Sequence, residues 1–87
     1  MFVYDFSFRS MTGAQIGRSV LQEAGIPAML SRAPKLISDQ GCGYVLEVSD
    51  FEGELAAQVL RRRGVGFRRV FRRYDNGDVE ELAYDLL

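Results

Sequence analysis

The chain has 87 residues, enough for one domain but not for a core plus a second folded unit. Its apolar fraction of 47% and charged fraction of 26% are those of an ordinary globular protein and argue against disorder. It contains no histidine and one cysteine, which excludes Ser-His-Asp and Cys-His catalysis, zinc sites built on imidazole and any internal disulfide. We therefore expect a protein that is not an enzyme and that holds no metal and no cofactor.

The net charge of −1 argues against the whole chain acting as a basic nucleic-acid binder. The longest apolar runs are three or four residues, far short of the ~20 that a membrane helix needs. The first residues show no basic stretch followed by an apolar one, so the sequence predicts no secretory signal and a cytoplasmic location.

Residues 2–8 alternate between aromatic and other side chains, which predicts a half-buried strand. Thr12 and Gln15 have the spacing of a capping box, so a helix is expected to begin there. The predicted apolar stripe of this helix consists of Ile16, Val20, Leu21 and Ala24. The helix should end at residues 25–27, where glycine, an apolar residue and proline follow one another.

The second half repeats this order. A short strand is expected over residues 28–32, a loop over 33–43 and a further strand over 44–48. Ser49 and Glu52 form a second capping-box pair ahead of a helix. The predicted apolar stripe of this helix is Phe51, Leu55, Val59 and Leu60. After the arginines at 61–63 and a glycine stop at Gly64, a last strand is expected over residues 66–72.

Two strand–helix–strand units in one chain predict an α+β fold, the ferredoxin-like β-α-β-β-α-β plait, with the two middle strands antiparallel. No linker divides the halves, so residues 1–87 are interpreted as a single domain: a plait over 1–73 and an acidic C-terminal extension over 74–87. Tyr74-Asp75-Asn76-Gly77 is a hairpin turn signal, which would lead into a fifth strand. Asp78 with Glu81 is a capping box, however, and we favour a short terminal helix over residues 78–86.

Charges are segregated near the end of the chain. Seven arginines lie between residues 61 and 73 with no acid among them, and the acids of residues 75–85 follow with no base. A phosphate or nucleic-acid patch is one reading. We favour a solvated basic strand face that the acidic tail neutralises, because the opposite charges are adjacent in sequence.

The one cysteine, Cys42, lies between Gly41 and Gly43, just before a predicted strand. Glycines on both sides let the backbone turn sharply, and nearby amides could then stabilise a thiolate or persulfide anion. Lys35 and Arg32 flank the same loop and could also favour the anion. Polar neighbours predict an exposed loop. The alternative, which the residues alone leave open, is that Cys42 is a small buried hydrophobic side chain.

Several short segments, spanning about residues 3–71, carry a resemblance to a known family: Phe6-Ser7-Phe8, Ala24-Gly25-Ile26-Pro27, Arg32-Ala33-Pro34, Ser38-Asp39-Gln40-Gly41-Cys42-Gly43 and Gly64-Val65. On these segments the chain resembles the selenium/sulfur (Se/S) carrier protein-like family, small proteins first described as a domain of unknown function. The resemblance implies that the sulfur of Cys42 is the carrier atom. Ser38 and the two flanking glycines belong to the same loop. Residues 74–87 depart from the family pattern.

The sequence therefore predicts a small sulfur or selenium carrier that uses Cys42 as a persulfide or perselenide acceptor. Its expected partners are donor and acceptor proteins, with no nucleic acid and no membrane, and a homodimer is the self-assembly to test. The alternative is a protein-interaction or regulatory module of ferredoxin-like fold in which Cys42 is structural.

Overall fold

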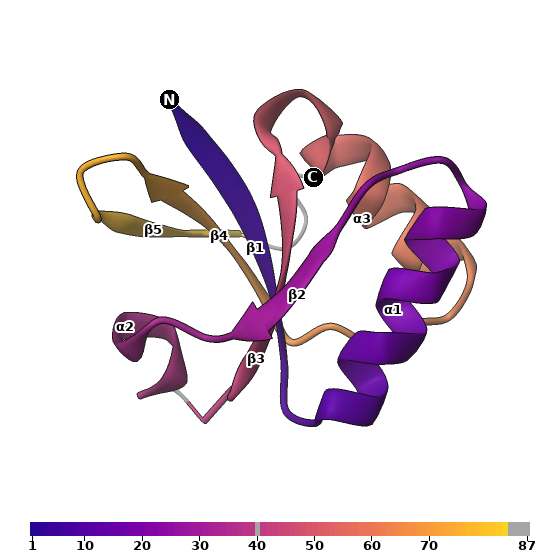
Figure 1. Cartoon of the computed structure of the whole chain (residues 1–87), viewed down its shortest axis with the longest axis horizontal. Coiled ribbons are helices and arrows are strands. Elements are labelled where there is room, and N and C mark those ends of the chain that lie inside the picture. Colours follow the sequence, from indigo (N-terminus) through magenta and orange to yellow (C-terminus); the bar gives the residue numbers. More distant parts are fainter. Residues whose placement is uncertain (40, 84–87) are drawn as a thin grey trace.

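The computed structural model of the chain describes residues 1–39 and 41–83. In chain order the elements are β1 (Phe2–Phe8), α1 (Met11–Glu23), β2 (Met29–Arg32), α2 (Lys35–Ser38), β3 (Tyr44–Ser49), the 3-10 helix η1 (Asp50–Glu52), α3 (Gly53–Arg62), β4 (Arg69–Tyr74) and β5 (Val79–Leu82). The strands form one antiparallel sheet in the order β2-β3-β1-β4-β5 (Figure 1). The predicted α+β class and the antiparallel pairing of the middle strands β2 and β3 are confirmed.

Both faces of the sheet are covered, but unequally. The helices α1 and α3 lie together on one face, and α2 lies on the other, as Figure 1 shows. The alternate residues Tyr4, Phe6 and Phe8 of β1 point to the face of the long helices and are buried there, as the alternation predicts. Phe6 meets Phe67 edge to face, with ring centroids 5.1 Å apart. This aromatic row forms the centre of the main core.

Small residues bring the long helices close to the sheet. In α1 the buried residues are Ala14, Gly17, Val20 and Leu21, and in α3 they are Gly53, Ala56, Ala57 and Leu60. The expected stripes were therefore wrong in part, because Ile16, Ala24, Phe51 and Leu55 are exposed, Phe51 to 83%. In α1 the buried face runs through Ala14 and Gly17 rather than Ile16, and in α3 it runs through Ala56 and Ala57 rather than Leu55. Phe51 precedes α3, in the 3-10 helix η1.

The helix starts also differ in detail from the capping-box predictions. The first helix is capped by Ser10, whose hydroxyl accepts the Gly13 amide at 3.0 Å, so it begins before Thr12. The Ser49 hydroxyl does pair with the Glu52 side chain, at 3.0 Å, but it caps no backbone amide. A 3-10 turn follows Ser49, and the regular helix α3 begins only at Gly53.

The terminal helix is a correction. Residues 79–82 form the strand β5, which pairs with β4, while residues 84–86 of the predicted helix lie outside the described residues. The turn between the strands is closed by the Tyr74 amide donating to the Asp78 carbonyl at 2.8 Å, with Gly77 at φ +93°. The free edge of β4 offers hydrogen-bond partners to the backbone N–H and C=O groups of this segment. A short isolated helix would pair fewer of them and is not stable alone.

The pairing of opposite charges is confirmed, although strand β5 rather than a helix provides it. Arg69 contacts Glu81 at 3.3 Å, and Arg72 contacts Glu80 at 3.7 Å. All four side chains are substantially exposed, so each pair contributes little stability and chiefly fixes the register of β5.

A Gly53→Ala variant should test how closely α3 approaches the sheet. A Cβ atom at Gly53 would overlap the ring of Tyr4, so we expect a loss of at least ~2 kcal/mol in the free energy of unfolding, despite the better helix propensity of alanine. Gly66→Ala is the matched control, because a Cβ there meets nothing within 4 Å, and it should change stability by less than ~0.5 kcal/mol. Urea denaturation of both variants measures this. Equal stability of the two would contradict the close packing.

Candidate functional site

The segment that carries Cys42 begins with a helix of four residues that the sequence did not predict. Pro34 precedes α2, and its carbonyl accepts the amides of Ile37 and Ser38 at 2.9 and 2.8 Å. Beyond the helix, the Gly41 amide donates to the Ser38 carbonyl at 2.9 Å, with Gly41 at φ +89°. A left-handed glycine therefore turns the chain out of α2 and toward β3.

Cys42 is buried, which contradicts the predicted exposed loop and agrees with the alternative of a small buried side chain. Its side chain is 1% exposed and the thiol is free. The Ala33 amide donates to the Gly43 carbonyl at 2.9 Å, extending the β2–β3 ladder by one residue pair. This bond holds the backbone next to Cys42 against the sheet, whereas the polar residues of the loop suggested that it lies in solvent.

Four of the predicted supporting residues, Arg32, Lys35, Ser38 and Gly41, make other contacts or face solvent. The Gly41 amide is used by the turn, and the Ser38 hydroxyl donates to the Lys35 carbonyl at 3.2 Å. The side chains of Lys35 and Arg32 are exposed, while the thiol lies beneath the surface. Of the two flanking glycines, only Gly41 has a backbone conformation that favours glycine. Gly43 has an ordinary φ, and a Cβ atom there would meet no neighbour.

A small second core lies beneath α2. Ile37, Val45 and Phe71 are each at most 1% exposed and pack together, with Ala33 and Val79 against them. This cluster joins α2 to the sheet on the face opposite the long helices. It is the apolar contact that holds the cysteine-bearing segment in place.

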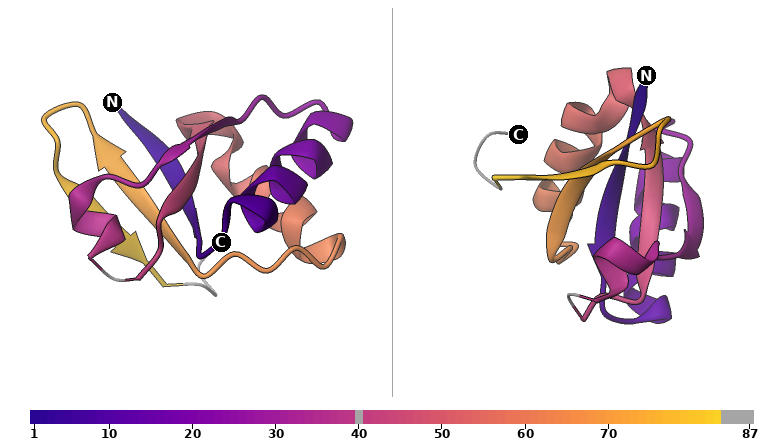
Figure 2. Two further views of the ribbon diagram at one scale, coloured as in Figure 1. Left: turned by 60° about the horizontal axis from the view of Figure 1, so that its bottom comes forward. Right: turned by 90° about the vertical axis from the view of Figure 1, so that its left-hand side faces the viewer.

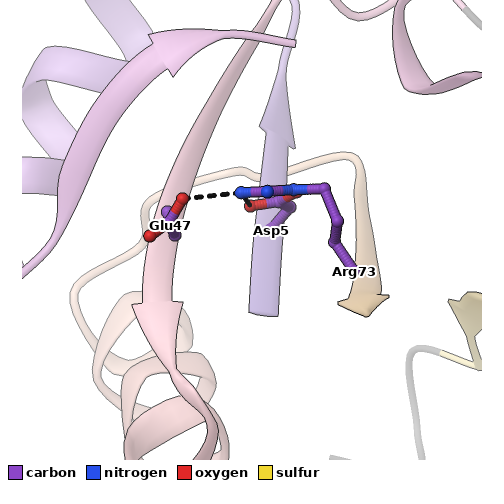
Figure 3. A network of polar contacts seen from close by, with 3 residues as sticks. All are labelled: Asp5, Glu47 and Arg73. Carbon is purple, nitrogen blue, oxygen red and sulfur yellow. Dashed lines mark hydrogen bonds and ion pairs between the residues drawn. The ribbon is translucent and has the colours of Figure 1, made fainter. Parts of the chain in front are cut away.

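A polar network that sequence reasoning missed lies on the same face (Figure 3). Arg73 in β4 donates to the Asp5 carboxylate through Nε at 2.7 Å and through Nη2 at 3.4 Å. Its Nη2 also donates to Glu47 Oε1 at 2.6 Å, so three neighbouring strands are tied together. The available signal was an aspartate within an alternating aromatic strand, on the face away from the aromatic residues.

Burial sets the electrostatics of this network. Asp5 is fully buried, and the loss of solvation raises its pKa, although the bond from Arg73 acts in the opposite direction. The bond to Asp5 raises the pKa of Arg73, which therefore stays a cation. The network is a structural tie between strands, and it has no nucleophile.

Within the described residues, no helix has the length and apolar character needed to cross a membrane. Across the same residues, no three His, Cys, Asp or Glu side chains are grouped so as to hold a metal ion.

Comparison with known proteins identifies the family. Residues 4–72 match the family described as "Putative Se/S carrier protein-like", and the chain belongs to this family. Neither the curated proteins nor the solved structures contain a match. The matched region includes α2, Cys42 and the first strands of the sheet, and it ends before the β4–β5 turn.

The Asp5 carboxyl should make stability depend on pH. Because its pKa is raised in the folded protein, ionised Asp5 is less favourable there than in the unfolded chain. Its contribution is therefore fully present below the ordinary value of 3.8 and is lost as the pH rises through the raised value. We expect wild type to lose stability relative to Asp5→Asn as the pH rises above 3.8, as measured by urea denaturation at a series of pH values. A difference that stays constant or changes in the opposite direction would show that Arg73 outweighs burial.

The two glycines beside Cys42 should behave differently when replaced. Gly41→Ala places a side chain at φ +89°, which costs about 1–2 kcal/mol and strains the turn. Gly43→Ala meets nothing within 4 Å and should be almost neutral. We expect Gly41→Ala alone to speed the reaction of Cys42 with a thiol reagent, because it destabilises the closed loop. Equal rates in the two variants would contradict this assignment.

Proposed function

We propose that this protein is a non-catalytic carrier of sulfur or selenium, with the Cys42 thiol as the acceptor. The observation that carries the proposal is family membership: the match over residues 4–72 includes the chain's one cysteine. With no histidine in the sequence, sulfur transfer by a thiol is the chemistry that these residues support best.

The transfer step needs no outside oxidant or reductant. The Cys42 thiolate attacks the terminal sulfur of a persulfide on the donor protein, forming a new S–S bond to Cys42. The S–S bond of the donor breaks at the same time, and the donor cysteine leaves as a thiolate. Delivery repeats the exchange in the other direction: a nucleophile of the acceptor takes the outer sulfur and expels the Cys42 thiolate. A selenium atom in the terminal position follows the same exchange.

Burial of Cys42 requires that the loop opens before a donor can reach the sulfur. The loop is held by the Gly41–Ser38 and Ala33–Gly43 hydrogen bonds and by the packing of α2. Two backbone bonds and one short helix are few enough to open locally without unfolding the sheet. We propose that the carrier works through this opening, so that the thiol is inert until it is released.

We propose that β1–β4 with α1 and α3 form a ferredoxin-like plait, which β5 extends at one edge, within a single domain. A carrier thiol must stay reduced, which favours the cytoplasm. The proposed partners are donor and acceptor proteins rather than nucleic acid, because Arg69 and Arg72 already face acids of β5.

A second candidate function is a protein-interaction module in which Cys42 is structural. The burial of the thiol favours it, as does a surface groove of about 410 Å³. Met29 and Phe51, both exposed, contribute apolar surface to this groove. In this reading Cys42 contributes packing alone, and its replacement should destabilise the fold without removing any transfer activity.

Incubation with a persulfide donor distinguishes the two functions. We expect a mass increase of about 32 Da on Cys42, absent in Cys42→Ser, when intact protein is analysed under native conditions. Alkylation by iodoacetamide should be slower than for an unstructured cysteine peptide, yet faster than global unfolding permits. If Cys42 gains no sulfur and reacts with iodoacetamide only at the rate of global unfolding, the carrier proposal fails and the interaction module replaces it.

A further inference from the structure

The hairpin of β4 and β5 forms one edge of the sheet, and α2 lies near it on the face away from the long helices. Figures 1 and 2 show the two segments side by side in different views, although about 30 residues of chain separate α2 from β4 and about 40 separate it from β5. The family match ends at residue 72, so the turn and β5 lie beyond the matched region.

The helix α2 cannot hold its position alone. Four residues are too few for a stable isolated helix, and Ile37 is its one buried residue. Ile37 belongs to the second core together with Val45 and Phe71, and Val79 of β5 packs against this cluster. The position of α2 therefore depends on an apolar contact that β5 completes.

The register of β5 places its two apolar side chains on opposite faces of the sheet. Val79 is opposite Arg73 and packs against the second core, whereas Leu82 is opposite Val70 and packs against the main core. One short strand therefore contacts both cores, and only one of the two contacts bears on α2. This arrangement supplies a matched pair of residues for an experiment.

On the solvent side of this apolar contact, the hairpin and α2 border an open cleft. A cleft of about 520 Å³ lies between them, lined by Leu36 of α2 and by residues of the hairpin. Leu36 is 60% exposed and does not seal the gap. Closure consequently depends on the second core, to which α2 contributes Ile37 and against which Val79 of β5 packs, and loss of the Val79 contact weakens the hold on α2.

Movement of α2 is transmitted to Cys42 through the backbone. The Asp39 amide donates to the Lys35 carbonyl at 3.0 Å and the Gly41 amide to the Ser38 carbonyl at 2.9 Å. Both acceptors belong to α2, so the turn that leads to Cys42 is built on that helix. When α2 leaves the sheet, the turn loses its anchor.

We propose that the β4–β5 hairpin is a clasp: it holds α2 against the sheet through Val79 and thereby keeps Cys42 buried, and its release exposes the thiol. The use of this device in sulfur transfer rests on the proposed carrier function. The mechanical coupling itself does not, and it is measured without any sulfur donor.

The test compares Val79→Ala with Leu82→Ala. The rate of reaction of Cys42 with iodoacetamide is measured in native buffer, and the free energy of unfolding of each variant is measured in urea. Removing two methyl groups from the inner contact should raise the reaction rate of Val79→Ala about fivefold or more. Leu82→Ala should raise the reaction rate of Cys42 only by the amount that its lower free energy of unfolding accounts for. Val79→Thr, which keeps the shape, serves as the substitute if Val79→Ala does not fold.

Amide hydrogen exchange supplies a second readout at named positions. Val79→Ala should speed exchange of the Ile37, Ser38 and Gly41 amides and leave the Ala14 amide of α1 unchanged relative to wild type. The clasp is overturned if Val79→Ala and Leu82→Ala change the Cys42 rate equally after correction for stability, or if the α2 amides keep their protection in Val79→Ala. Faster exchange and alkylation without any persulfide adduct would support the clasp and refute the carrier.

Discussion

Arg73 bridges two carboxylates on neighbouring strands, and the covering of the second sheet face depends on this bridge. Asp5 lies at the centre of β1 and is fully buried, on the face opposite the aromatic core. A buried carboxylate without a cation costs several kcal/mol, so β4 must lie beside β1 with Arg73 in register. Ser7, also buried, reinforces the same pairing by exchanging hydrogen bonds with the Arg69 backbone. The polar tie thus fixes the strand next to which β5 folds.

Beside this polar network lies the small apolar cluster under α2, and the two have different consequences. The network is charged and specific in geometry, so it sets which strands meet. The cluster of Ile37, Val45 and Phe71 is small, so it holds α2 with far less free energy than the main core holds the long helices. A protein built in this way has a rigid sheet and one weakly held segment, and that segment carries its only thiol.

Local rules predicted the elements whose stability is local. The alternation in residues 2–8 gave β1 with its aromatic face, and the glycine stop after α1 lies where expected. The rules failed where a distant partner decides the structure. Residues 79–82 carry a helical capping pattern, yet backbone pairing along the free edge of β4 makes them a strand. Cys42 is the same kind of failure, because its polar neighbours describe the loop surface and say nothing of the β2 ladder that holds Gly43 against the sheet.

Burial of a carrier thiol has a cost and a benefit that can be weighed. A persulfide on the surface is open to any thiol or oxidant, whereas one beneath the surface reacts only when the loop opens. If opening costs about 2–3 kcal/mol, the exposed state is populated at roughly 0.6–3%. Unwanted exchange is then slower, by the same fraction, than it would be at a fully exposed thiol. A docked partner that stabilises the open loop removes the penalty for productive transfer alone. The weakness of the second core is then a requirement of the function, because a segment held as firmly as α1 would keep Cys42 closed to its donor as well.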